Sequence, residues 1–245
     1  MVYWTYAQQL SSNRTMPPRY LRDIDFQASP GHAQTREFNA STHCVVSAYL
    51  HALGKVEGNG TWKIVVVAYG EPEKLCEAVG GVGVDLLGVR CVNMLFDYGG
   101  YWAADKQQRK RMLLDRLHES VLLVCETVGI SSAPFARAYE TVLANGIRHE
   151  RLWGRLKLNR QRTRRASIWY EFDADKIEVF AVAGEASSSG WTIKRKLFDC
   201  PPDDWYLYDA LGRSRWVDEH TFELTANTGP RHVTPVAGKT WRARF

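Results

Sequence analysis

The chain has 245 residues, of which 45% are apolar and 24% are charged, so we expect a folded protein of one large or two small domains. The formal net charge of +5 is too small to imply nucleic acid by itself. No run approaches the roughly 20 apolar residues that span a membrane. Residues 1–10 lack the basic and apolar regions of a secretory signal, so we expect a soluble, cytoplasmic protein. The five cysteines show no CxxC spacing and predict reduced, buried thiols.

The N-terminal part predicts strands separated by turns. Residues 1–19 are polar and are expected to form a surface arm. Residues 44–53 are apolar and stay ambiguous between strand and helix, while residues 71–78 predict a short helix. Residues 80–88 are glycine-rich but fit neither the dinucleotide fingerprint nor a P-loop, and they predict a flexible loop. Three runs predict strands, the second of them β-branched and therefore covered on both faces: residues 20–28, 62–69 and 89–96.

Residues 105–146 predict a helical hairpin. Apolar residues at steps of three and four form one stripe from Leu113 to Val128, which is the period of a helix. The loop between the two helices is short, and this favours an antiparallel pair. The start and stop signals are Asp105 and Gly129 for the first helix, and Ser132 and Gly146 for the second.

After Gly146 the apolar period changes to two, which predicts an antiparallel meander. The strand candidates are residues 155–158, 168–172, 177–182, 191–198, 205–208 and 214–217. The tail, residues 228–245, is polar and basic, with Trp241 as a candidate docking residue.

These elements predict an α+β fold in which an antiparallel meander packs on a helical hairpin, with additional N-terminal strands. We divide the chain into an N-terminal α/β part, residues 1–104, and a helical hairpin plus antiparallel sheet, residues 105–245. Whether residues 1–104 are a separate domain stays open.

One basic segment, residues 148–165, concentrates the positive charge. It holds eight Lys or Arg residues and one acid, a formal +7, whereas the rest of the chain sums to −2. Arginines clamp phosphates and tryptophan stacks on bases, but Arg and Trp also anchor protein interfaces. The remaining interpretation is a solvated strand edge protected by charge. The candidate partner-binding residues are Arg148, Arg151, Trp153, Arg155, Lys157, Arg160, Arg162, Arg164 and Arg165.

Other chemistry has little support in the sequence. The histidines are scattered and no helical zinc pair occurs, so we expect no metal and no cofactor. His43 and Cys44 are adjacent, and on a strand they would point to opposite faces. The acid pairs at residues 173–175 and 203–204 are typical of turns. We expect a non-catalytic protein, although a hydrolase assembled from distant Asp, His and Cys residues stays open.

The layout of residues 105–220, a helical hairpin followed by the strand pair at residues 156–160 and 166–172 and then by residues 177–182, resembles bacterial immunity proteins encoded beside secreted toxins. This resemblance implies a cytoplasmic protein-binding module that neutralises one cognate toxin by occlusion. The arginines of the basic segment would then meet acidic residues of the toxin. The alternative is a nucleic-acid-binding accessory protein that uses the same segment.

Overall fold

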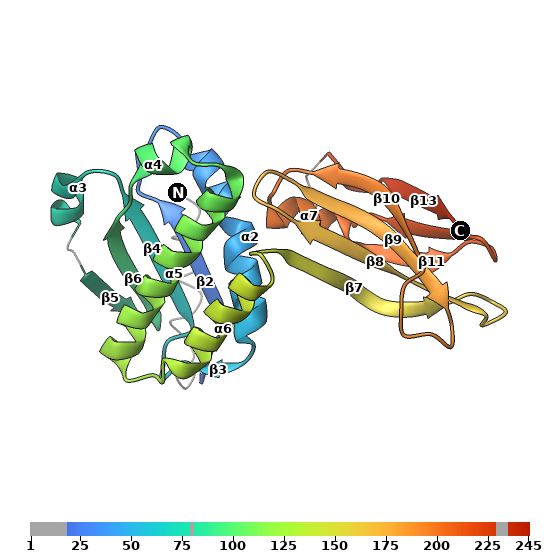
Figure 1. Ribbon diagram of the computed structural model, residues 1–245, viewed down its shortest axis with the longest axis horizontal. Coiled ribbons are helices and arrows are strands. Elements are labelled where there is room, and N and C mark those ends of the chain that lie inside the picture. The colour runs from blue at the N-terminus through green and yellow to red at the C-terminus, as the bar shows by residue number, and fades with distance from the viewer. Residues whose placement is uncertain (1–18, 79–80, 229–234) are drawn as a thin grey trace.

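The computed structural model describes residues 19–78, 81–228 and 235–245, and it confirms the α+β class. Two lobes lie side by side (Figure 1): an α/β lobe that contains the helices up to α6, and a second lobe of strands from β7 to β13. The arm expected at residues 1–19 lies, except for Arg19, outside the described residues.

A four-stranded mixed sheet forms the base of the α/β lobe. Its order is β2-β4-β6-β5, with the first three strands parallel and β5 antiparallel to β6. The strands are β2 (Asp23–Ala28), β4 (Lys63–Tyr69), β5 (Gly81–Leu86) and β6 (Val89–Leu95), and a small separate pair joins β1 (Tyr20–Leu21) to β3 (Val56–Glu57). The flexible loop expected at residues 80–88 is therefore wrong, because β5 finds a pairing partner in β6.

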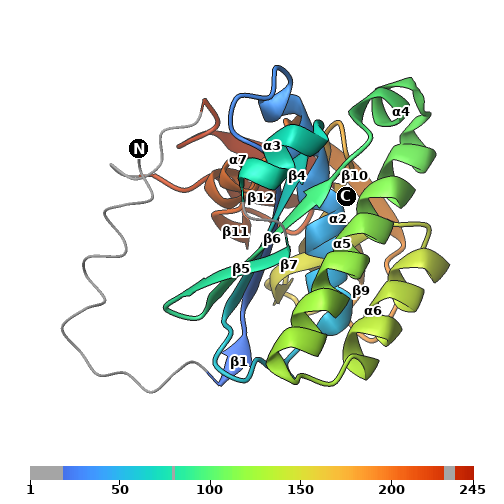
Figure 2. The same cartoon turned by 90° about the vertical axis from the view of Figure 1, so that its left-hand side faces the viewer.

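Helices α2 (Thr35–Leu53) and α5 (Lys106–Val128) lie on one face of the mixed sheet, and α6 (Ala133–Ala144) packs beside them (Figure 2). Two short helices complete the lobe: α3 (Pro72–Glu77), which has no buried residue, and α4 (Tyr98–Ala103). Ile64, Val66 and Ala68 of β4 are buried on the face that the helices cover, whereas Val65 on the opposite face is partly exposed. The ambiguous run at residues 44–53 is the second half of α2.

The predicted helical hairpin forms, and its first helix has both of the expected caps. The Asp105 carboxylate accepts a hydrogen bond from the Gln108 amide at 2.9 Å, and Gly129 ends α5 in the left-handed conformation. Ser132 precedes α6 but makes no capping hydrogen bond. The hairpin packs on α2, β4 and β6, so it shares a hydrophobic core with residues 19–104.

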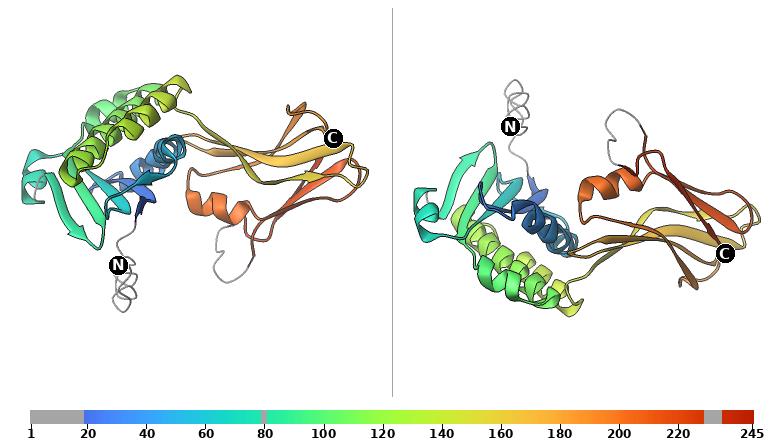
Figure 3. Two further views of the ribbon diagram at one scale, coloured as in Figure 1. Left: turned by 90° about the horizontal axis from the view of Figure 1, so that it is seen from below. Right: turned by 90° about the horizontal axis from the view of Figure 1, so that it is seen from above.

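The second lobe is a sandwich of two antiparallel sheets that lie face to face (Figure 3). One sheet has the order β10-β9-β8-β7 and the other β11-β12-β13. The strands are β7 (His149–Leu158), β8 (Arg164–Phe172), β9 (Ile177–Glu185), β10 (Ile193–Cys200), β11 (Arg213–Trp216), β12 (Thr221–Thr225) and β13 (Thr240–Arg244). The meander thus packs on a second sheet, while the helical hairpin covers the mixed sheet.

One expectation for the C-terminal part is wrong. Residues 205–208 belong to a helix, α7 (Asp204–Ala210), because Leu207 and Leu211 lie one turn apart and are both buried. This burial overrides the strand preference of the aromatic residues. Trp241 lies in β13 and stacks on Phe198 of β10 with ring centroids 4.0 Å apart, so it packs between the two sheets.

Candidate functional site

Strand β7 carries most of the basic segment and lies at the edge of its sheet. It pairs with β8 on one side, and no strand of the described residues pairs with its other side. Every residue of β7 after His149 is exposed. We call the exposed stretch from Glu150 to Leu158 the β7 surface. An edge strand offers unpaired backbone groups to another chain, which is the basis of strand addition and of aggregation.

The β7 surface is more apolar than a charged edge needs to be. Leu152, Leu156 and Leu158 are 38%, 45% and 48% exposed, and Trp153 is 37% exposed. Isolated exposed leucines are ordinary, but three exposed leucines and an exposed tryptophan on one strand are not, and we call these four residues the apolar strip. The charge pattern of the sequence did not indicate that these leucines belong to a binding surface.

The β7 strand is regular only in its first half. Residues from His149 to Trp153 pair in register with β8 from Phe172 to Ile168. The register then shifts between Trp153 and Lys157, where Gly154 adopts a φ of 75°. Such a bulge bends an edge strand and increases its twist.

The second sheet lies against the distal half of β7. The Trp216 indole donates a hydrogen bond to the Lys157 carbonyl at 3.0 Å. The Asn159 amide at the end of the strand donates to the Glu219 carboxylate at 2.6 Å. The freely accessible edge is therefore the first half, Glu150 to Trp153.

Five of the eight cations of the basic segment have no ion-pair partner among the described residues: Arg151, Arg155, Lys157, Arg160 and Arg162. All five are exposed. Arg148 is the exception at the start of the strand, with its guanidinium 3.7 Å from the Glu150 carboxylate. A row of unpaired positive charges thus accompanies the apolar strip.

The remaining two cations are built into the fold. Arg165 lies over the Trp191 ring at 4.5 Å and donates to the Gly190 carbonyl at 2.8 Å. Arg164 is half-buried, and its Nη1 atom is buried without a hydrogen-bond partner in the described residues. Arg164 and Arg165 therefore lie apart from the exposed row formed by the other cations.

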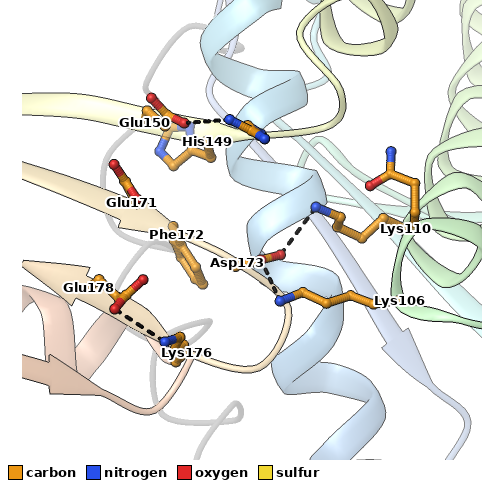
Figure 4. A pocket seen from close by; sticks show the side chains of 11 residues that line it. Lys106, Lys110, His149, Glu150, Glu171, Phe172, Asp173, Lys176 and Glu178 are labelled. Atoms are coloured by element: carbon orange, nitrogen blue, oxygen red, sulfur yellow. Dashed lines mark ion pairs between the residues drawn. The ribbon is translucent and has the colours of Figure 1, made fainter.

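A polar pocket of about 410 Å³ lies where the two lobes meet (Figure 4). Lys106 and Lys110 of α5 approach Asp173 at 2.5 and 3.2 Å, and Lys176 approaches Glu178 at 3.1 Å. Burial raises the pKa of Asp173, but hydrogen bonds from Lys106 and from the Ala174 amide outweigh this and leave that pKa below its usual value. The charges at this junction compensate one another, and this suits a structural contact better than capture of a charged ligand.

His149 lies at the same junction and is buried. Its Nε2 atom is 3.2 Å from the Tyr170 hydroxyl, and its ring centroid is 5.9 Å from that of His51. Burial lowers the pKa of His149 to about 4, and the nearby charges of His51 and Arg151 contribute to this shift. The imidazole is therefore neutral near pH 7 and fixes the start of β7.

Three of the five cysteines are buried as predicted, whereas Cys91 is partly buried and Cys76, on the short helix α3, is exposed, so for Cys76 the prediction is wrong. Cys44, Cys125 and Cys200 are buried and free, and burial raises the pKa of Cys44 to about 12. Such a thiol is not an activated nucleophile. His43 and Cys44 lie on α2 and not on a strand. The described residues contain no group of three or more His, Cys, Asp or Glu side chains suited to a metal ion.

Comparison of the chain with family models, curated proteins and solved structures finds no match. Among the described helices, none has the length and apolar character to cross a membrane.

Proposed function

We propose that the protein is a non-catalytic module that binds a protein partner through the β7 surface. One observation supports this most directly: an edge strand exposes Leu152, Leu156 and Leu158 beside unpaired cations. Interfaces favour an apolar centre, aromatic residues and arginine, with charge complementarity that steers the approach. A surface that served only for solubility would not need the leucines.

The resemblance to immunity proteins suggests the finer form of this proposal. In that form the partner is a toxin encoded beside this protein, and the β7 surface meets acidic residues of the toxin and occludes its active site. The arginines would increase the rate of association, while the leucines would lengthen the life of the complex.

The experiment is a pull-down of the tagged full-length protein from its native cell lysate, in nuclease-treated and untreated halves. We expect one stoichiometric protein that survives nuclease. The triple variant Leu152→Ser/Leu156→Ser/Leu158→Ser should no longer capture this protein. The control variant Arg195→Glu, which changes an exposed residue of the opposite edge strand β10, should still capture it. Equal retention by all variants would remove the β7 surface from the interface.

The immunity form has its own test. The polypeptide encoded beside this protein is produced alone and together with it, and growth of the host cells is measured. Growth arrest by the neighbour alone, relieved by the wild-type chain but not by the leucine variant, is the expected result. A harmless neighbour would contradict the immunity form and leave protein binding intact.

The second candidate is nucleic-acid binding, which the unpaired row Arg151, Arg155, Arg160 and Arg162 favours. It predicts affinity that falls steeply with salt, because neutralised phosphates release their counterions. Titration of labelled DNA and RNA at increasing salt measures this slope. We rank this function second because exposed leucines contribute nothing to phosphate contacts.

A further inference from the structure

We propose that the partner contributes an extended segment which adds to β7 as a fifth strand of the sheet, and that this segment alternates acidic and apolar side chains. This inference rests on the function proposed above and names the chemistry of its partner. It concerns the first half of β7, from Glu150 to Trp153, and not the distal half beside the second sheet.

The backbone of this half-strand supports strand addition. Residues Glu150 to Trp153 pair regularly with β8, so the backbone is already extended and ordered. Outside that pairing, the backbone of residues 150–153 makes one hydrogen bond within the described part of the chain: the Ser167 hydroxyl of β8 donates to the Trp153 carbonyl at 3.3 Å. In strand addition, backbone hydrogen bonds supply affinity and alternate side chains supply specificity.

The side chains of this half-strand define what the added segment carries on each face. Arg151 and Trp153 pair with Tyr170 and Ile168, whose side chains are buried, so they lie on the face that looks toward the sandwich interior. Leu152 pairs with Trp169 on the outer face. An added strand would therefore place an acid near Arg151 and an apolar residue near Leu152, in alternation.

The charges argue against a second copy of this chain as the occupant. Pairing β7 with β7 of another copy would place side by side two strands that each carry Arg151, Arg155 and Lys157, with Glu150 as the only acid in each. Like charges opposite each other destabilise a strand pair. An acidic segment relieves the repulsion that these cations exert on one another.

The test uses a short capped peptide of alternating glutamate and valine as the probe, with the full-length protein. Two comparison peptides have the same length: one replaces each valine by proline, which removes backbone N–H donors, and the other replaces each glutamate by lysine. Binding is measured by fluorescence anisotropy, and backbone protection by hydrogen exchange. We expect the regular acidic peptide to bind, and each comparison peptide to bind with an affinity about tenfold or more lower.

Variants locate the binding. Arg151→Glu/Arg155→Glu should weaken binding of the acidic peptide about tenfold or more, whereas Arg195→Glu on β10 should leave it unchanged. The amides of residues 150–153 should exchange more slowly when the peptide is bound. These residues are exposed, so the variants are expected to fold, and an unchanged thermal transition verifies this.

The possible failures are distinguishable. If the proline-containing peptide binds as well as the regular one and no β7 amide is protected, strand addition is wrong. If no acidic peptide binds while the lysate partner is still captured through the leucines, the inference about the partner's chemistry is wrong and the proposed function stands. Absence of any captured partner would instead remove the proposed function itself.

Discussion

Lys110 Nζ lies 3.2 Å from Asp173 Oδ1, and this pair joins helix α5 of one lobe to the β8–β9 turn of the other. The Lys110 side chain is only 6% exposed, so its charge depends on the carboxylate. Asp173 also contacts Lys106. Lys110 therefore depends on Asp173 more than Asp173 depends on Lys110, because Asp173 has a second cation while Lys110 has no other acid within 4.0 Å in the described structure.

Removing the carboxylate should destabilise the protein strongly. We expect Asp173→Ala to lower the free energy of unfolding by about 3 kcal/mol, since a buried ammonium loses its partner. The exposed neighbour Asp175 is the matched control, because Lys106 is its one ion-pair partner among the residues that the structure describes, and Asp175→Ala should cost less than about 1 kcal/mol. Urea denaturation measures both values. Equal losses would show that Lys110 gains little from Asp173.

Acid should destabilise the fold through His149. The imidazole has a pKa near 6.5 when unfolded and about 4 when folded, so the unfolded chain binds the proton first as pH falls. Stability contributed by the neutral ring is present above pH 6.5 and decreases toward pH 4, by about 3 kcal/mol in total. Unfolding measured at several pH values should show this decrease in the wild type and a smaller one in His149→Gln. The control variant His220→Gln, at an exposed position, should lose stability with falling pH as the wild type does. If the stability of His149→Gln also fell in parallel with that of the wild type, His149 would not be the cause of the loss.

Two glycines should respond differently to alanine. A Cβ atom at Gly212 would lie 2.3 Å from the Thr225 carbonyl oxygen, so Gly212→Ala forces the backbone apart and should cost at least about 2 kcal/mol. Gly129 has open space but a φ of 69°, so Gly129→Ala should cost only about 1 kcal/mol. Thermal unfolding ranks the two variants. The reverse order would mean that helix termination matters more than this close approach.

The exposed leucines should matter for binding and not for stability. Leu152→Ser, Leu156→Ser and Leu158→Ser should each lower the free energy of unfolding by no more than about 1 kcal/mol, because about two fifths or more of each residue is already exposed to water. Ile168→Ser in the adjacent strand is the contrasting variant, since Ile168 is fully buried. Thermal unfolding and partner capture are measured on the same samples. A large loss of stability in the leucine variants would indicate a packing role.

Local signals predicted the local elements. The stripe from Leu113 to Val124 is fully buried, and Asp105 and Gly129 lie at the helix ends, because these features depend on neighbouring residues. The packing partners of the helical hairpin could not be predicted in the same way, because they come from distant parts of the chain. The Tyr49 hydroxyl of α2 lies 2.9 Å from His118 Nδ1 of α5, and this contact joins residues far apart in the chain.

Only part of the proposed binding surface could be predicted from the sequence. The charge count at residues 148–165 indicated the segment, and the alternation of Arg155, Leu156, Lys157 and Leu158 indicated a strand. An alternating strand normally buries its apolar face. The leucines stay exposed here because β7 is the outermost strand, and the order of strands in a sheet depends on pairing between distant segments. The same long-range packing separates Arg164 and Arg165 from the exposed row.

The two edge strands of the β7–β10 sheet differ in how far their side chains are engaged in contacts within the molecule. On β10, Lys194 and Lys196 pair with Glu171 and Glu178, and the strand has its own register shift. The ring of Phe198 is covered by Trp241. If β7 is the only edge of this sheet that accepts an added strand, each molecule can pair with one other strand, and no free edge of the sheet is left for a second one. Assemblies built on this sheet would stop at a single pairing and would not polymerise into fibres.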